Sequence, residues 1–327
     1  MRHLLGLEHT TAQEISELLN TAVSFKDVLS RPVKKVPTLR GKSVITLFYE
    51  ASTRTRTSFE TAAKIMSADA INIAVAQSSV IKGESLKDTI LTLQALKADC
   101  IIIRHPSSGA PEMATKYINL PVINAGDGRH EHPTQGLLDL LTIWEHKGKR
   151  TEIKPTVGSE ATHDFDLSGL KVAIVGDLAH SRVARSDVWG LTRMGASVRW
   201  IGPQTLLPRD ADQLPVSLHT DLHEGLEDVD VVIVLRLQTE RMERGLLPSL
   251  REYSRVWGVN AQSLKVAKPD VLVMHPGPMN RGVEIASDVA DGENGIRAAI
   301  EQQVTNGVAA RMSVLYHLMG APGISEV

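Results

Sequence analysis

Short apolar runs alternate with segments of helical periodicity along the first half of the chain. Strand candidates are 43–48, 71–75, 100–103 and 121–124. Helical patterns lie between them at 57–67, 84–97 and 109–118, and another at 11–30 precedes the first strand. Because parallel strands need long crossover connections, this alternation predicts a parallel sheet covered by helices.

The second half of the chain repeats the alternation. Its strand candidates are 170–175, 197–201, 229–235, 256–259 and 271–274, and a long helical run covers 294–319. Pro133 opens a helix over 134–146, and the polar segment 147–166 has no period, which predicts a surface loop or insertion. We therefore expect an α/β fold of two doubly wound parallel-sheet domains with a shared interdomain cleft.

The segment from Ser52 to Ser58 lies between the first strand candidate and the helix that follows it. It places five hydroxyl groups and two guanidinium groups within seven residues, at a predicted helix N-terminus. An ordinary N-cap explains one or two hydroxyls, but not arginines in a first turn where the helix dipole disfavours cations. Free amides, hydroxyls and arginines together favour an oxyanion such as phosphate.

Polar side chains also follow the other strand candidates. These positions are Arg104-His105-Pro106, the run 126–135, Gly176-Asp177 with Arg182, Arg236 with Gln238, and 275–278. An arginine or histidine alone at such a place is usually a solvated or structural group. Because ligands of open α/β sheets bind beyond the carboxyl ends of the strands, six such strand ends together predict a binding site.

Composition excludes several classes of function. The chain has 327 residues, a formal net charge of −2 and one cysteine, Cys100, which we expect to be buried in a strand. Without an excess of positive charge, binding to nucleic acid or to an anionic membrane is not expected. The absence of a transmembrane run and of a signal peptide predicts a soluble cytoplasmic protein.

Three local patterns allow other interpretations. His130-Glu131-His132 offers possible metal ligands, but the helical His-Glu-x-x-His spacing is missing, so we favour His132 and Gln135 as donors and acceptors for a small ligand. The segment from Gly176 to Arg182 lacks the glycines of a dinucleotide loop. We therefore expect neither metal nor cofactor. The loop around Lys82 is equally compatible with a capped surface turn and with a mobile loop that brings a cation to a substrate.

Taken together, these motifs resemble the aspartate/ornithine carbamoyltransferase family over essentially the whole chain. The matching pieces are Ser52-Thr53-Arg54-Thr55-Arg56, Arg104, His132-Pro133-x-Gln135, Gly176-Asp177-Leu178 through Arg182, Arg236-x-Gln238 and His275-Pro276-Gly277-Pro278. The ornithine enzymes typically have His-Cys-Leu-Pro where this chain has His275-Pro276-Gly277-Pro278. In this segment, in the Arg236-x-Gln238 pair and in the Lys82 loop, the chain is similar to the aspartate branch.

The resemblance implies a fold, a reaction and an assembly. The expected domains are 1–140, which binds carbamoyl phosphate and receives the C-terminal helix 305–327, and 141–304, which binds aspartate. The implied reaction transfers the carbamoyl group of carbamoyl phosphate to the amine of L-aspartate in pyrimidine biosynthesis. The family also implies a homotrimer, in which Ser79 and Lys82 reach the neighbouring subunit's site. Regulatory chains or a dihydroorotase partner are possible but have no readable motif.

The resemblance also assigns roles to residues, and the side-chain chemistry agrees with them. The catalytic residues are expected to be Arg54, Thr55, Arg104 and His132. Those that bind carbamoyl phosphate are Ser52, Thr53, Arg54, Thr55, Arg104, His132, Gln135, Gly277 and Pro278. Those that bind aspartate are Lys82, Arg182, Arg236 and Gln238. A carbamoyltransferase for ornithine or another amine is the alternative, followed by a non-catalytic protein that binds phosphorylated metabolites.

Overall fold

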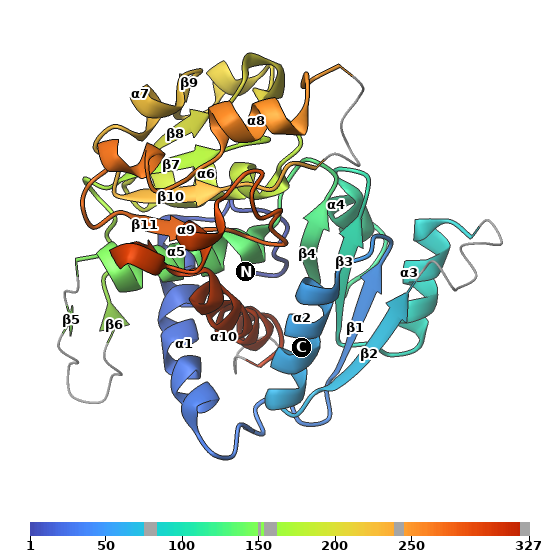
Figure 1. The fold of residues 1–327 in the computed structure, drawn as a ribbon. Helices are drawn as coiled ribbons and strands as arrows, with labels where there is room; N and C mark the ends of the chain where they lie inside the picture. The colour runs from blue at the N-terminus through green and yellow to red at the C-terminus, as the bar shows by residue number, and fades with distance from the viewer. Residues whose placement is uncertain (75–83, 150–151, 154–161, 239–244, 321–327) are drawn as a thin grey trace. The chain divides into compact units, whose positions relative to one another are not determined.

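The computed structural model describes residues 1–74, 84–149, 152–153, 162–238 and 245–320. The chain divides into two compact units. The first, which we call the N-unit, consists of Met1–Leu138 and the chain from Thr305 onward, and the second, the C-unit, is Asp139–Val304. Each unit contains its own parallel sheet (Figure 1), which confirms the predicted fold class of two parallel-sheet domains.

The N-unit is built on a four-stranded sheet of order β2-β1-β3-β4. Its strands are β1 Ser43–Phe48, β2 Asp69–Ala74, β3 Cys100–His105 and β4 Val122–Asp127, all parallel. Its helices are α1 Ala12–Ser30, α2 Thr53–Ile65, α3 Leu86–Ala95 and α4 Ala110–Thr115. The central strands β1 and β3 are apolar and buried on both faces, as expected for a parallel sheet covered by helices. Cys100 is fully buried there, as the sequence predicts.

The C-unit contains a six-stranded sheet of order β12-β11-β10-β7-β8-β9. Its strands are β7 Lys171–Val175, β8 Ser197–Ile201, β9 Val216–His219, β10 Val231–Val234, β11 Leu272–Met274 and β12 Arg297–Ala298. Its helices include α6 Arg182–Arg193, α7 Leu222–Leu226, α8 Leu250–Trp257 and α9 Ser287–Ala290. None of the helices among the described residues is both long enough and apolar enough to cross a membrane.

Two long helices contain the boundaries between the units. Helix α5, Pro133–Lys147, begins at the predicted proline, and α10 covers Ile300–Met319. The part of α10 in the N-unit is held to α1 and α2. Ser313 Oγ donates to the Leu18 carbonyl at 2.6 Å, and Arg311 donates to Ser58 Oγ at 3.0 Å while its guanidinium lies over the Phe59 ring.

Two predictions made from periodicity are wrong, and two strands were not predicted. Residues 256–259 are not a strand, because Ser249 caps α8 and the helix continues to Trp257, with Val256 half exposed. The last helix begins at Ile300 rather than at 294, since the chain adopts positive φ values at Asn294 and Gly295 and then forms β12. Strands β9 and β12 were missed because they are short and partly exposed.

The segment 147–166 also differs from the featureless loop that its composition predicts. Its described part contains two short antiparallel strands, β5 Glu152–Ile153 and β6 Thr162–His163. At its end, Phe165 is buried against the Trp144 ring, with a centroid distance of 4.5 Å, and Trp144 Nε1 donates to the Asp164 carbonyl at 2.9 Å. The sequence did not predict this structure, because a few aromatic contacts hold the segment and it has no periodic pattern of apolar residues.

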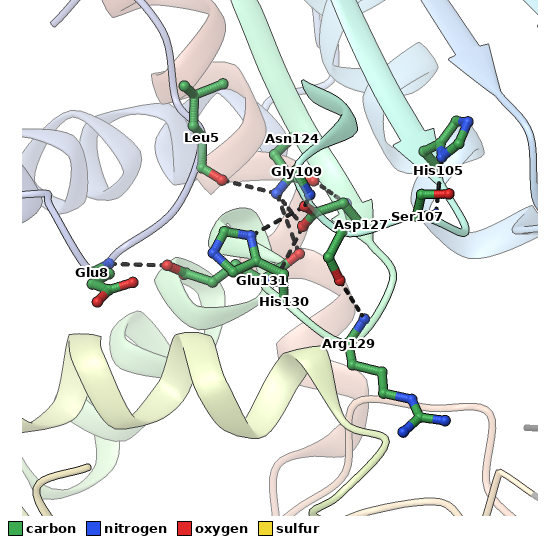
Figure 2. A network of polar contacts seen from close by, with 12 residues as sticks. Leu5, Glu8, His105, Ser107, Gly109, Asn124, Asp127, Arg129, His130 and Glu131 are labelled. Carbon is green, nitrogen blue, oxygen red and sulfur yellow. Dashed lines mark hydrogen bonds and ion pairs between the residues drawn. The ribbon is translucent and has the colours of Figure 1, made fainter. Parts of the chain in front are cut away.

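A network of buried polar side chains fixes the loop between β4 and α5 (Figure 2). The Asp127 carboxylate accepts hydrogen bonds from Asn124 Nδ2 at 2.7 Å, the Gly109 amide at 2.7 Å and the Glu131 amide at 3.1 Å. Its Oδ2 also lies 3.1 Å from His130 Nδ1. Because Asp127 is almost completely buried, these contacts replace the water that its charge would otherwise need.

Replacing Asp127 with Asn should destabilise the N-unit in a pH-dependent way. Burial alone would raise the pKa of Asp127, but the hydrogen bonds from His130, Asn124 and Gly109 lower it below its ordinary 3.8. A lowered pKa stabilises the fold above the ordinary value, and this contribution is lost as the pH falls through the folded-state pKa. We expect the free energy of unfolding of the variant to fall by about 2–3 kcal/mol at pH 7, because the NH₂ group of the new asparagine would face other buried donors.

Urea unfolding of both proteins between pH 3 and pH 7 measures this difference, which should shrink toward the acid end. Asp27→Asn, on the exposed surface of α1, is the matched control and should change stability by less than about 0.5 kcal/mol. The pKa of His130, which its hydrogen bond to Asp127 raises, should also fall in the Asp127 variant. An equal loss of stability at every pH would contradict this account of Asp127.

Candidate active site

The strand order of each sheet reverses direction at one point. In the N-unit the chain runs from β1 to β2 on one side and then to β3 on the other. In the C-unit it runs from β7 through β8 to β9 and then crosses to β10. Such switch points are where open α/β sheets bind ligands, beyond the carboxyl ends of the strands. The predicted site residues of each unit should therefore lie near the switch point of that unit's sheet.

The oxyanion candidate Ser52–Thr55 lies at the N-terminus of α2, directly after β1. Ser52 is the N-cap residue, with extended backbone dihedral angles of −157° and 91°, and its side chain makes no capping hydrogen bond. Thr55 is buried, whereas Thr53 and Arg54 are exposed, and the first turn contains no acidic residue. The positive end of this helix is therefore not neutralised by an acid in its own first turn, which suits it to an anion.

Arg104 lies near the end of β3, the strand on the other side of this switch point. Its Nε is 3.3 Å from Glu50 Oε2, and its Nη1 donates to the Ala125 carbonyl at 3.2 Å. Both side chains of the ion pair are largely buried, with 14% and 19% of their surface exposed. Glu50 is not among the predicted site residues, because no local pattern in the sequence links it to Arg104. Because β1 and β3 are neighbours, Arg104 and Ser52–Thr55 belong to the same sheet edge.

His132 and Gln135 follow β4, the next strand of the same edge. Both side chains are buried, and the backbone N–H of Gln135 donates to the His132 carbonyl at 2.8 Å in the first turn of α5. His105 Nδ1 instead accepts from the Ser107 backbone amide at 2.9 Å, so this side chain closes a turn and has a structural role. Burial lowers the pKa of His105. Strands β1, β3 and β4 therefore bring the N-unit candidates to adjacent carboxyl ends.

A possible cation cluster exists near this loop, but it does not include His132. Ligand atoms of Glu8, His130 and Glu131 lie within 4.8 Å of one another, and they line a cavity of about 470 Å³ beside the N-terminal segment. Figure 2 shows Glu131 directed toward this segment, where its carboxylate accepts from the Leu7 amide at 2.7 Å and the Glu8 amide at 3.0 Å. Glu131 thus has a structural role in joining the N-terminal segment to the loop.

In the C-unit, the loop from Gly176 to Ser181 follows β7. Gly176 has a φ of 131°, and a Cβ there would lie 2.9 Å from the Leu235 carbonyl, so only glycine lets the ends of β7 and β10 approach this closely. Asp177 is fully buried, and its Oδ1 is 2.7 Å from His180 Nδ1. Burial raises the pKa of Asp177, although hydrogen bonds from His180 and Gln238 oppose this effect.

The C-unit candidates lie on the two sides of its switch point. Arg182 is the first residue of α6 and is almost completely buried, next to Ser181, whose Oγ caps the helix by accepting from the Ala184 amide at 3.1 Å. Arg236 and Gln238 follow β10 and are half-buried. Gln238 Nε2 donates to the His180 carbonyl at 3.1 Å, so the loop after β7 and the segment after β10 are directly joined.

Gly277 and Pro278 follow β11, which neighbours β10 in the sheet. Both residues are at least partly exposed, and a cis peptide bond joins them. Strands β7, β10 and β11 are adjacent and parallel, so the C-unit candidates share one sheet edge in the same way as those of the N-unit. Lys82 and Ser79 lie outside the residues that the structure describes.

Protein-family models match the chain as two successive domains. Residues 2–145 match the carbamoyl-P binding domain of aspartate/ornithine carbamoyltransferase, and residues 168–318 match its Asp/Orn binding domain. The chain is 57% identical to the aspartate carbamoyltransferase catalytic subunit of Heliobacterium modesticaldum over 100% of this chain and 98% of that one. It is 54% identical to that of Pelotomaculum thermopropionicum over 98% and 97% of the two chains.

Solved structures of two enzymes share the fold. Aspartate transcarbamoylase from Trypanosoma cruzi, in complex with carbamoyl aspartate and phosphate, matches with a TM-score of 0.81 and 29% identity over 97% of this chain and 96% of that one. Ornithine carbamoyltransferase from Pyrococcus furiosus matches with a TM-score of 0.80 and 29% identity over 98% of both chains. Sequence motifs, sheet topology and both domain matches agree, and the chain belongs to the aspartate/ornithine carbamoyltransferase family.

Proposed function

We propose that this chain transfers the carbamoyl group of carbamoyl phosphate to the amine of L-aspartate, which gives N-carbamoyl-L-aspartate and phosphate in pyrimidine biosynthesis. The observation with most weight is the pair of arginines, Arg182 and Arg236, that follow the neighbouring strands β7 and β10. Two guanidinium groups suit a substrate with two carboxylates, whereas the second amine of ornithine would need an acid. The names of the similar catalytic subunits support the same substrate.

In this proposal, the N-unit binds carbamoyl phosphate through its phosphoryl group. Ser52, Thr53, Arg54 and Thr55 offer amides, hydroxyls and a cation at the N-terminus of α2. Arg104 adds a guanidinium whose direction is set by Glu50 and the Ala125 carbonyl. A donor that is already oriented loses little conformational freedom when the anion binds, so more of each interaction contributes to affinity.

The reaction itself is attack of a neutral amine on the carbonyl carbon of a mixed anhydride. Negative charge develops on the carbonyl oxygen, and Thr55, Arg104 and His132 are the proposed donors that stabilise it. The Gln135 side chain and the backbone carbonyls beside Gly277 and Pro278 would accept from the carbamoyl NH₂ group. The departing phosphate is the proposed acceptor of the amine proton. Close placement of the two substrates would supply much of the remaining acceleration.

The family resemblance supports three further proposals. The chain is proposed to form a homotrimer and to act in the cytoplasm. Ser79 and Lys82 are proposed to reach the site of a neighbouring subunit, where Lys82 would bind aspartate. Sedimentation equilibrium measures the assembly, and a monomer that retains full activity would contradict both the trimer and the shared site.

The first test is the choice of amine. Purified protein incubated with carbamoyl phosphate should release phosphate and form N-carbamoyl-L-aspartate with L-aspartate. Rates with ornithine, putrescine and N-acetylated amines should be lower by about 100-fold or more, because these amines lack the two carboxylates that the arginines are proposed to bind. Mass spectrometry identifies the product. Efficient turnover of ornithine would favour the alternative carbamoyltransferase, and binding without turnover of any amine would favour a non-catalytic binding protein.

Arg104→Ala should reduce turnover far more than the affinity for aspartate. Loss of one donor to a developing oxyanion costs about 2.7–4 kcal/mol in comparable sites, so kcat should fall about 100- to 1000-fold. Arg129→Ala is the matched control, because this exposed arginine lies in the loop after β4 and its side chain points away from the buried network (Figure 2). Initial rates with varied aspartate measure both parameters, and an unchanged kcat would remove Arg104 from the mechanism.

Arg236→Ala should mainly weaken the use of aspartate. Hydrogen bonds between charged groups contribute about 1.5–3 kcal/mol, so the KM for aspartate should rise about 10- to 150-fold while that for carbamoyl phosphate stays nearly constant. The exposed Arg209, also in the C-unit, provides the control variant Arg209→Ala. The opposite pattern, with impaired binding of carbamoyl phosphate and normal aspartate kinetics, would show that the proposed roles of the two units are wrong.

A further inference from the structure

The backbone after β11 is held by an imidazole that lies inside the C-unit. The Gly277 amide donates to His275 Nδ1 at 2.8 Å, and the His275 side chain has no exposed surface. The His275 amide donates to Gln303 Oε1 at 2.9 Å, and Gln303 Nε2 donates to Asp139 Oδ1 at 2.6 Å. Both the beginning of this segment and its turn at Gly277 are therefore fixed by buried side chains.

The bond to His275 determines where the preceding carbonyl points. The peptide unit between Pro276 and Gly277 is planar and trans, so its N–H and C=O groups point in opposite directions. Because the Gly277 N–H is directed at the buried imidazole, the Pro276 carbonyl is directed away from it. Among the described residues no donor reaches this carbonyl. It therefore remains an available acceptor beside Gly277.

The same bond also fixes the proton of the imidazole. A neutral imidazole has one N–H group, and since Nδ1 accepts from Gly277, the proton must be on Nε2. Nε2 lies 3.4 Å from Glu284 Oε1, and neither side chain has any exposed surface. Without this carboxylate, the proton could move to Nδ1, where it would face the Gly277 N–H as a second donor. Glu284 therefore favours the one tautomer that is compatible with the observed backbone.

Glu284 acts on both sides of the turn. The oxygen that faces His275 Nε2 also accepts from the Asn280 amide at 2.5 Å. The Glu284 carbonyl accepts from the Val259 amide at 2.9 Å, which ties this residue to the segment after α8. One buried carboxylate thus joins a residue before Gly277 and Pro278 to a residue after them.

From this geometry we propose that Glu284 is a positioning residue that, through the tautomer of His275, directs the Pro276 carbonyl toward the NH₂ group of carbamoyl phosphate. This inference rests on the proposed function, because it concerns how that substrate is recognised. The NH₂ group is what distinguishes carbamoyl phosphate from acetyl phosphate, which has a methyl group in its place. A correctly directed carbonyl should therefore favour carbamoyl phosphate specifically, and it should not change the affinity for inorganic phosphate.

The first experiment compares two replacements of His275. In His275→Asn, the side-chain oxygen takes the place of Nδ1 and can accept from Gly277, as in an Asx turn. In His275→Gln, the side-chain amide group takes the place of Nε2, where its NH₂ can face Glu284, and the bond from Gly277 is lost. We expect His275→Gln to reduce the preference for carbamoyl phosphate over acetyl phosphate about tenfold or more and to lower kcat. We expect His275→Asn to stay within about threefold of the wild type.

The second experiment makes the same comparison at Glu284. Glu284→Gln keeps an oxygen for His275 and Asn280, whereas Glu284→Met has nearly the same length and no comparable acceptor. The Met variant should show the reduced preference for carbamoyl phosphate, and the Gln variant should restore most of it. Competitive inhibition by acetyl phosphate and by inorganic phosphate gives the reference affinities, which should stay within about twofold in all four variants.

A spectroscopic measurement on the wild-type protein makes the test independent of whether the variants fold. The ¹⁵N chemical shifts of the His275 ring should show a neutral imidazole with its proton on Nε2. A proton on Nδ1 would overturn the inference, as would an equal loss of affinity for carbamoyl phosphate, acetyl phosphate and phosphate in His275→Gln or Glu284→Met. Failure of the wild type to form N-carbamoyl-L-aspartate would instead refute the proposed function, while an active wild type with an unaltered preference in these variants would refute this inference alone.

Discussion

Burial of the sheet strands on both faces is the constraint on which the rest of the structure depends. Strands β1, β3, β7 and β10 are almost entirely apolar and buried, so they have little room for chemically useful side chains. Polar groups are consequently confined to the places where strands end and the backbone reaches solvent. In each sheet the strand order reverses once, and helices diverge there to opposite faces. The proposed binding residues of both units lie at these carboxyl ends because the apolar strands leave them few other positions.

Two pairs of polar side chains at these strand ends are largely buried, and in each pair one side chain orients the other. Glu50 pairs with Arg104, and His180 pairs with Asp177. A buried ion pair contributes little net stability, because desolvation offsets the attraction between its charges. Its main effect is to hold one side-chain direction, which reduces the entropy lost when a ligand binds. The proposed action of Glu284 on His275 follows the same logic, but it orients a backbone carbonyl in place of a cation.

The sequence predicted the alternation of strands and helices well, because apolar runs such as 100–103 and 231–235 are unambiguous. It also placed Ser52–Thr55, Arg104, Arg182 and Arg236 after strands, where the structure has them at or near strand ends. It failed where tertiary contacts override periodicity, as at 256–259, where a capped helix replaces a strand. It could not identify the partners Glu50 and Glu284, since their importance depends on which residues the fold brings to them. Glu284 in particular lies nine residues from His275, and no local pattern links the two.

The surroundings of Asp177 give a physical reason for preferring a dianionic amine as the second substrate. A substrate with an additional cationic group would need a carboxylate that is free to bind it. At the carboxyl edge of the C-unit sheet, the Asp177 carboxylate already accepts from His180, and the Gln238 amide lies 3.4 Å from its Oδ2. Burial raises the pKa of Asp177, and the hydrogen bonds from these partners oppose that effect. Using Asp177 to bind a substrate would therefore break the contacts that join the β7 loop to the β10 segment. The carboxylates of aspartate are instead proposed to bind at Arg182 and Arg236, which are cations, so this substrate does not require the Asp177 carboxylate.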